Sequence, residues 1–315
     1  MKKKSLYTLF LGFPCLFAAC TADNLQKLSF DVTLRNDASS IHVGEEVVFD
    51  FSGDPDYIVF WSGEDGHKYE NRNRTSVQVD ELVLSYSVLQ RYGRPQTNDI
   101  LSIKVSEDFS GDYTKEGIEA ATWTELSQRD DKEKDWWVPS GDQNPAFAAQ
   151  GDLSAYKDRP FYIAFQYRTP EKLSEGVQHP RVDITPVSLD KRFDGKTVRA
   201  ANPQADMGFR HVRLSDEKYI GTGTGVDATT IRFQAANDQA DLARYIEMWC
   251  ISQPIDASRT ATDKGEPIRS LTVPSDSYVH VFTEAGTYTV TFVARNANAW
   301  NTEELVREIV IEVLD

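Results

Sequence analysis

Apolar and polar residues alternate along most of this chain with the two-residue period of β-strands. β-Branched and aromatic residues fill the apolar positions, and Gly, Pro, Asp and Asn separate the segments. Clear examples are EEVVFDF (45–51), DYIVFW (56–61), DILSIKV (99–105), PFYIAFQY (160–167), SYVHVF (277–282), TYTVTFVA (287–294) and REIVIEV (307–313). Short helices are expected only at TKEGIEAA (114–121) and QADLARYIE (239–247). The pattern predicts an all-β protein built from sandwiches.

The first twenty residues follow a different pattern. Three lysines precede an apolar run that begins at Leu6, and two alanines lead directly into Cys20. This order is typical of an export signal, and it resembles a bacterial lipoprotein signal in which Cys20 carries the lipid. The run is shorter than the ~20 apolar residues of a membrane helix. We therefore expect a signal peptide at 1–19 and a lipidated cysteine with a tether at 20–29.

Charge and cysteine content narrow the range of partners. The formal net charge is −15, and loss of the three leader lysines makes it more negative. Such a surface repels nucleic acid and anionic membranes, so membrane contact is expected through the lipid alone. Once Cys15 leaves with the leader and Cys20 takes lipid, Cys250 cannot form an intrachain disulfide. The apolar run EMWCISQPI around it predicts a buried, inert thiol.

Two distant segments resemble the two halves of one small domain. IHVGEEVVFDFSGDPDYIVFWSGEDGHKY (41–69) resembles the opening of a PKD or immunoglobulin-like sandwich, and YVHVFTEAGTYTVTFVARN (278–296) resembles its closing strands. Neither half reaches the roughly 80–100 residues that such a sandwich needs. The resemblance implies a split domain formed by 30–75 together with 258–315. Two separate modules, one of them truncated, are the alternative.

The intervening residues 76–257 carry a second resemblance. Their motifs are similar to those of jelly-roll (galactose-binding-like) modules in exported Bacteroidota proteins, namely DILSIKVSEDFSGDY (99–113), AATWTELS (120–127), GDLSAYKDRPFYIAFQYRT (151–169) and EMWCISQPID (247–256). The last motif usually precedes the others, so the order here fits a circularly permuted jelly roll. Permutation is compatible with insertion into a host loop, because the two ends of a sandwich commonly lie close together.

The combination resembles a lipoprotein family of uncharacterised domains encoded beside starch-utilisation-type glycan importers. The resemblance implies a non-catalytic, SusE/SusF-like glycan-binding lipoprotein, anchored in the outer membrane and facing the cell exterior. Its expected partners are a SusC/SusD-like importer and a polysaccharide or oligosaccharide, neutral because the chain is acidic. Two alternatives stay open: a structural or partner-binding subunit of the importer complex, and a glycan-active hydrolase.

Motifs for metal or covalent chemistry are scarce. The five histidines lack zinc-binding spacing, no serine lies in a GxSxG elbow, and GTGTG (221–225) lacks the lysine of a phosphate loop. With 49 acidic residues, pairs of carboxylates carry no information about hydrolysis. Asp108 and Asp112 in EDFSGDY could hold a structural calcium ion, although turn capping is the alternative. We expect no other cofactor.

Aromatic side chains are the remaining candidates, because a sugar ring can stack its apolar face on them. Trp61 matches the core tryptophan of the immunoglobulin-like pattern, and Trp123 and Trp249 lie in apolar segments that favour burial. The candidates in polar or turn-rich surroundings are Trp136, Trp137, Trp300, Tyr92 and Tyr156. Possible hydrogen-bonding neighbours are Arg91, Arg94, Gln143 and Asn144. If EKDWWVPSGD were a strand, alternation would point one of its tryptophans inward and one outward.

Overall fold

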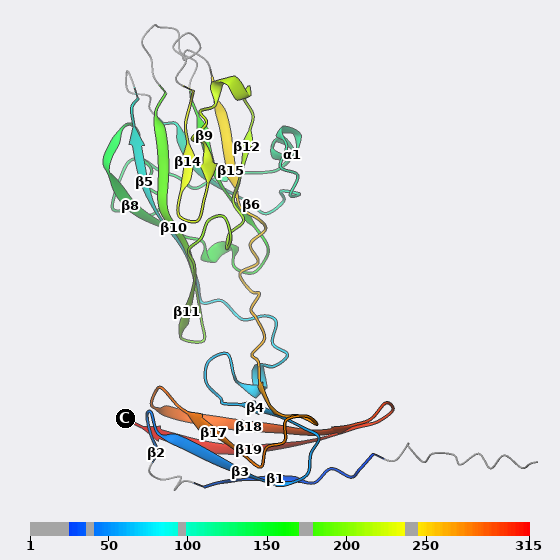
Figure 1. Ribbon diagram of the computed structural model, residues 1–315. Helices are drawn as coiled ribbons and strands as arrows, with labels where there is room; N and C mark the ends of the chain where they lie inside the picture. Colours follow the sequence, from blue (N-terminus) through cyan, green and yellow to red (C-terminus); the bar gives the residue numbers. More distant parts are fainter. Residues whose placement is uncertain (1–24, 36–40, 94–98, 170–178, 237–244) are drawn as a thin grey trace, which may run out of the picture. The chain divides into compact units, whose positions relative to one another are not determined.

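A computed structural model describes residues 25–35, 41–93, 99–169, 179–236 and 245–315 (Figure 1). Cys20, and with it the expected lipidation, lies outside the described residues, as does most of the expected helix at 239–247. The chain divides into two compact units. Unit 1 comprises Met1–Arg74 with Thr262–Asp315, and unit 2 comprises Thr75–Ala261.

Strands dominate both units, which confirms the all-β, β-sandwich-like fold class. In the described part of the chain the helical elements are short: α1 (Lys115–Ala120), η1 (Tyr69–Asn71), η2 (Ser154–Tyr156) and η3 (Glu217–Tyr219). α1 begins after Thr114, whose hydroxyl accepts a hydrogen bond from the Gly117 amide at 3.1 Å. This is an ordinary N-terminal cap. The jelly-roll resemblance and its circular permutation stay predictions.

Unit 1 consists of two sheets built from both ends of the chain. The three-stranded sheet has the order β1 (Phe30–Leu34), β3 (Glu46–Gly53), β17 (Ser277–Val281). The five-stranded sheet has the order β16 (Glu266–Arg269), β4 (Tyr57–Trp61), β18 (Gly286–Ala297), β19 (Thr302–Leu314), β2 (Ile41–His42). Phe49 lies 5.0 Å from Phe292 between ring centroids, which joins the two sheets in one core. Trp61 is buried, as its sequence context predicts, but it packs against Tyr69, 5.5 Å away between ring centroids, and lies outside this core cluster.

Unit 2 also contains two sheets, which we name by their central strands (Figure 1). The β10 sheet has the order β13 (Gly225–Val226), β14 (Ile231–Phe233), β10 (Arg181–Phe193), β5 (Glu81–Arg91), β8 (Gln143–Asp152), and β11 (Lys196–Ala200) also pairs with β10. The β9 sheet has the order β12 (Arg210–Arg213), β15 (Glu247–Ile251), β9 (Tyr162–Arg168), β6 (Leu101–Ser106), β7 (Thr124–Glu125).

The core of unit 2 lies between these two sheets. Tyr167 of β9 stacks on Phe233 of β14 with centroids 5.6 Å apart, and both rings are fully buried. Cys250 is buried in the same core, and burial raises the pKa of its thiol well above the ordinary value. An inert thiol is the expected consequence.

The two ends of unit 2 lie side by side. The Val77 amide donates to the Ser258 carbonyl at 2.8 Å, and the Thr260 amide donates to the Thr75 carbonyl at 3.0 Å. The segment that enters unit 2 and the segment that leaves it therefore lie next to each other. This is the geometry expected of an inserted domain.

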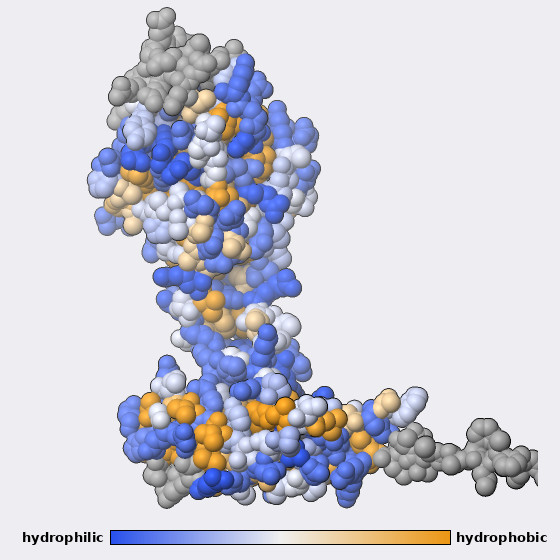
Figure 2. All heavy atoms as spheres, in the orientation of Figure 1, coloured by the Kyte–Doolittle hydropathy of each residue, from blue (hydrophilic) through white to orange (hydrophobic). Residues whose placement is uncertain are grey.

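Most of the exposed large hydrophobic residues in the described chain belong to unit 1, and Figure 2 shows such residues on its surface. Val279 and Val281 are examples on β17, which is an edge strand of its sheet. Among the described residues, no helix is both long and apolar enough to cross a membrane.

Candidate functional site

The outer face of the β9 sheet combines aromatic and charged side chains. In β15, alternation sends Met248 and Cys250 into the core, whereas Glu247 and Trp249 point to the outer face. Gln166 of β9 lies opposite Trp249 in the register of the sheet. Glu247 and Trp249 are thus fixed on one face of a paired strand.

A small apolar cluster covers part of this face. Ile118 of α1 and the rings of Phe109 and Trp249 are buried there, and Trp123 packs against them. Trp123 follows α1, and its indole N–H donates to the Ile118 carbonyl at 3.0 Å, near the end of the helix. The centroids of Trp123 and Trp249 lie 5.1 Å apart with a 54° tilt. The two rings therefore form a bent aromatic surface.

A groove of about 450 Å³ opens beside these rings. Trp123, Trp249 and Tyr245 are its aromatic lining, while Lys104, Glu119 and Glu247 are charged residues around it. Its size is within the range of pockets that hold small organic ligands. We call it the tryptophan groove.

Glu247 is held in place by three donors. Its Oε1 accepts hydrogen bonds from Gln166 Nε2 at 2.7 Å and from Trp249 Nε1 at 2.8 Å. Its Oε2 accepts one from the Tyr245 hydroxyl. Because the same carboxylate contacts Trp249 and Tyr245, it fixes the positions of two aromatic residues of the groove.

Lys104 is oriented by a pair with Glu125, whose Oε2 lies 2.9 Å from the lysine Nζ. Burial raises the pKa of Glu125. Hydrogen bonds from Lys104, Ser127 and Ser102 lower this pKa by more than burial raises it, so the net shift is downward. The Glu125 carboxylate is therefore ionised at neutral pH. The groove offers apolar ring faces together with two lysines and two carboxylates, which suits a ligand with one apolar face and a polar edge.

A second cavity of about 470 Å³ adjoins the tryptophan groove, since Lys115 and Leu214 line both. His211 lines this cavity, and its ring makes a T-shaped contact with Phe233, 4.9 Å between centroids. Burial lowers the pKa of His211 to about 4, so the imidazole is neutral at pH 7.

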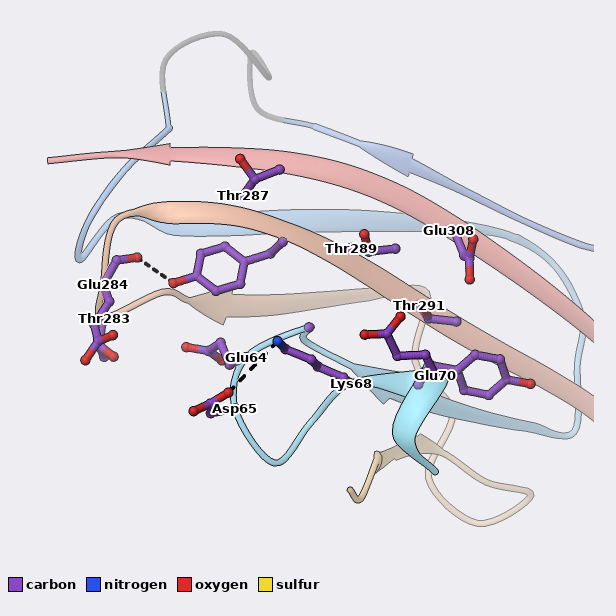
Figure 3. Close-up of a pocket in the computed structure, with 13 residues that line it drawn as sticks. Glu64, Asp65, Lys68, Glu70, Thr283, Glu284, Thr287, Thr289, Thr291 and Glu308 are labelled. Atoms are coloured by element: carbon purple, nitrogen blue, oxygen red, sulfur yellow. Dashed lines mark hydrogen bonds and ion pairs between the residues drawn. The ribbon is translucent and has the colours of Figure 1, made fainter. Parts of the chain in front are cut away.

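Unit 1 has a larger pocket, of about 840 Å³, with a different chemistry (Figure 3). Five carboxylates and four threonine hydroxyls line it, against one lysine: Glu64, Asp65, Glu70, Glu284, Glu308, Thr283, Thr287, Thr289, Thr291 and Lys68. Lys68 already pairs with Asp65 at 4.0 Å, and Glu64 contacts His280 at 2.9 Å. The pocket is acidic, and the rings beside it are the tyrosines Tyr69 and Tyr288.

Trp136 lies in a turn and Trp137 forms an isolated bridge with Gln128, so EKDWWVPSGD is not the strand that the alternation argument requires. Trp136 has a positive φ of 66° and is half-buried, packed on Gly151. Trp137 is 3% exposed, and its ring meets Phe147 edge-on at 4.7 Å. Lys132 Nζ lies 4.8 Å from the Trp137 ring centroid. Neither ring is openly exposed, and ligand contact by either one stays a prediction.

The other three aromatic candidates lie in three separate segments of the chain. Trp300 is 76% exposed at the tip of the β18–β19 hairpin of unit 1. Tyr92 is 51% exposed just after β5, with a positive φ of 73°. Tyr156 is half-buried in η2 and lies 5.7 Å from Phe161 between centroids. Of these, Trp300 belongs to unit 1 and the two tyrosines to unit 2.

Of the two suggested calcium ligands, Asp108 uses its carboxylate to bind neighbouring groups of the chain. Asp108 Oδ1 accepts hydrogen bonds from the Ser106 hydroxyl and the Thr122 amide, both at 2.8 Å, and bonds of this kind lower the Asp108 pKa. The Asp112 carbonyl accepts from the Thr114 amide just before α1. In the described part of the chain, no group of three or more His, Cys, Asp or Glu residues could hold a metal ion.

Sheets, core and groove together define an all-β protein of the β-sandwich kind with an aromatic-lined groove on a sheet face. The chain belongs to the family described as Domain of unknown function (DUF5017), whose model matches residues 19–207. The match includes Trp123 and Lys104 on one side of the groove and ends before Glu247 and Trp249. No curated protein and no solved structure matches the chain.

Sequence reasoning placed Trp123 and Trp249 in a core and so missed the groove. Trp249 is indeed buried, but in the outer cluster beside the groove and not between the sheets. The sequence did contain one signal for the groove, which is Glu247 two positions before Trp249. Positions i and i+2 share one face of a strand, so a charged residue there indicates that Trp249 lies on the outer face of the sheet.

Proposed function

We propose that this protein is a non-catalytic glycan-binding lipoprotein whose tryptophan groove holds the sugar. The observation that carries the proposal is the bent aromatic surface of Trp123 and Trp249 beside the fixed carboxylate Glu247. A sugar ring would lay its C–H face on the indoles, while its hydroxyls would exchange hydrogen bonds with Glu247 and Lys104. The proposal includes a SusE/SusF-like role, in which lipid on Cys20 holds the protein at the outer cell surface beside a SusC/SusD-like importer.

Binding is favoured over hydrolysis by the surroundings of the two groove carboxylates. Glycosidases use one carboxyl as acid and a second as base or nucleophile. Glu247 accepts three hydrogen bonds within the groove, and Glu119 is an exposed helix residue 3.8 Å from Lys115. Both carboxylates therefore already interact with side chains of the protein, which does not favour the roles of catalytic acid and base.

The test is affinity electrophoresis of the chain through gels that contain a panel of neutral polysaccharides. At least one polymer should retard the wild-type chain, and Trp123→Ala should abolish that retardation in a variant that circular dichroism shows to be folded. Trp300→Ala, which removes the most exposed tryptophan, is the matched control and should migrate as wild type does. Release of reducing sugar from a retarding polymer would replace the binding proposal by the hydrolase alternative.

A partner-binding subunit of the importer complex is the second candidate function. The exposed valines on the edge strand β17 favour it, because unpaired edge strands with apolar side chains readily pair with another chain. Co-purification of the importer with wild type but not with Val279→Lys, in the absence of any glycan retardation, would support this candidate instead.

A further inference from the structure

Three arginines converge on one aspartate on the outer face of the β10 sheet. Asp183 belongs to β10, and its side chain is 5% exposed. In the sheet register Asp183 lies opposite Arg232 of β14, and Arg181 lies opposite Arg91 of β5. The core-facing neighbours Val182 and Ile184 lie on the other face. We call Arg91, Arg181 and Arg232 the arginine cluster.

Asp183 accepts hydrogen bonds from all three arginines. Arg232 Nε donates to Oδ1 at 2.5 Å, Arg181 Nη2 donates to Oδ2 at 2.6 Å, and Arg91 Nη2 donates to Oδ2 at 3.4 Å. Burial raises the pKa of Asp183, but the bonds from Arg181 and Arg232 outweigh it and the net shift is downward. The aspartate is therefore an anion that orients the arginines.

The cluster has more positive charge than its aspartate can neutralise. One ion pair needs one guanidinium, and additional guanidiniums at this range repel one another. The nearby carboxylate of Asp227 is engaged by the amides of Thr229 and Thr230, both at 2.9 Å. A local excess of arginine is unexpected in a chain whose net charge is −15. The excess of arginines indicates that the cluster does more than form ion pairs within the fold.

The guanidinium groups retain capacity for a ligand. The arginine side chains are 26–36% exposed, so the cluster is accessible from solvent. Arg91 Nε is buried and has no hydrogen-bond partner among the described residues. Planar guanidiniums match the two oxygens of a carboxylate or sulfate, and each can donate two parallel hydrogen bonds.

Tyr92 supplies an aromatic ring beside the cluster. Its ring centroid lies 5.3 Å from the Arg91 guanidinium carbon, and half of the side chain is exposed. Its positive φ is uncommon for a bulky residue, and such strain is often maintained at binding sites. An exposed ring next to a cation suits a sugar that carries an acidic substituent.

We propose that the arginine cluster binds the carboxylate or sulfate group of an acidic sugar, with the sugar ring packed on Tyr92. The chain's overall negative charge opposes densely charged polymers, so the ligand carries isolated acidic groups. This site lies on the β10 sheet, away from the tryptophan groove on the β9 sheet, and the inference does not depend on the proposed function of that groove.

The test is calorimetric titration of the full chain with three hexasaccharides. They are a hyaluronan fragment with carboxylates alone, a sulfated galactan fragment with sulfates alone, and a neutral galactan fragment. One acidic fragment should bind, with affinity about tenfold or more lower in Arg232→Gln and in Arg91→Gln. Whichever acidic fragment binds identifies the substituent as carboxylate or sulfate.

Controls separate this site from structural effects and from the groove. Arg199→Gln removes an exposed arginine of β11 that pairs with Asp190, and it should bind as wild type does. Arg91→Gln breaks only the longest contact to Asp183, so its unfolding midpoint should match that of wild type. Trp123→Ala should leave acidic binding unchanged. The inference is overturned if neither acidic fragment binds, or if both cluster variants bind the acidic fragment with wild-type affinity.

Discussion

Glu247 and Trp249 show how two residues on one strand face define a site. Their side chains are two positions apart, and a 2.8 Å hydrogen bond joins the indole N–H to the carboxylate. The bond satisfies the polar atom of a mostly buried ring while leaving the ring beside the groove. Trp123, which is half-buried, completes the surface.

For the tryptophan groove, we predict that Trp123→Ala weakens binding of a retarding glycan by about 10- to 100-fold, because aromatic anchors dominate such sites. Isothermal titration calorimetry measures the effect. Trp300→Ala should bind with unchanged affinity. Equal losses in both variants would show that the hairpin tip of unit 1 contributes as much as the groove.

His211 makes the stability of unit 2 dependent on pH. Its folded pKa of about 4 lies below the ordinary value of 6.5, so the unfolded chain takes up a proton first as pH falls. The free energy of unfolding should therefore decrease between about pH 6.5 and 4, by about 3 kcal/mol, and this contribution should level off below pH 4. Denaturant unfolding at a series of pH values measures it.

The matched variants are His211→Gln, which removes the titrating group, and His67→Gln, which removes an exposed imidazole. The first should reduce the slope in this window by the His211 contribution, and the second should reduce it less. An unaltered slope in His211→Gln would mean that the His211 imidazole is accessible to protons in the folded chain.

At the scale of elements, two glycines of unit 1 have similar backbones but different neighbours. Gly53 ends β3 with φ +90°, and a Cβ there would lie 2.0 Å from the Ser29 carbonyl oxygen. Gly44 lies in the turn before β3 with φ +82°, and a Cβ there would meet nothing within 4 Å. Substitutions at Gly44 would therefore test backbone strain alone, and substitutions at Gly53 would test backbone strain together with steric overlap.

We predict that Gly44→Ala lowers the free energy of unfolding by about 1 kcal/mol, the cost of a positive φ with a side chain. Gly53→Ala should cost about 3 kcal/mol or more, since β1 must also move away from the added methyl group. Thermal and denaturant unfolding measure both. Similar losses in the two variants would contradict the close approach of β1 and β3.

Sequence patterning predicted the elements better than the site. Alternation indicated the strands at 56–61, 160–167 and 287–294, and the sequence also indicated a short helix at 114–121, because local propensity and periodicity fix such elements. It could not indicate the turn at Trp136, whose positive φ depends on packing against Gly151. Nor could it show that α1 and Trp123 cover the outer face of the β9 sheet, since that depends on tertiary contacts.

At the scale of the whole molecule, the arrangement of units is visible in sequence only through resemblance. The pairing of β4 with β18 joins residues more than two hundred positions apart, and no local pattern encodes it. The same holds for the arginine cluster, whose members come from β5, β10 and β14. The β4–β18 pairing and the arginine cluster both depend on the order of strands in the sheets, which the sequence pattern does not give.

Because the ends of unit 2 are hydrogen-bonded to each other, we predict that residues 75–261 fold when expressed alone. Circular dichroism should show a β-rich fragment with a cooperative thermal transition. A matched fragment, 75–245, lacks β15 and should fail to show that transition. If 75–261 unfolds without cooperativity, then the strands of unit 1 are needed for its stability.

The six tryptophans of the chain provide the most direct test of the tryptophan groove. Each indole N–H gives one signal in a ¹H–¹⁵N spectrum, which single Trp→Phe variants assign. On titration with a retarding glycan, the signals of Trp123 and Trp249 should shift, and those of Trp61 and Trp300 should not. Shifts at Trp136, Trp137 or Trp300, with Trp123 and Trp249 unchanged, would contradict the account.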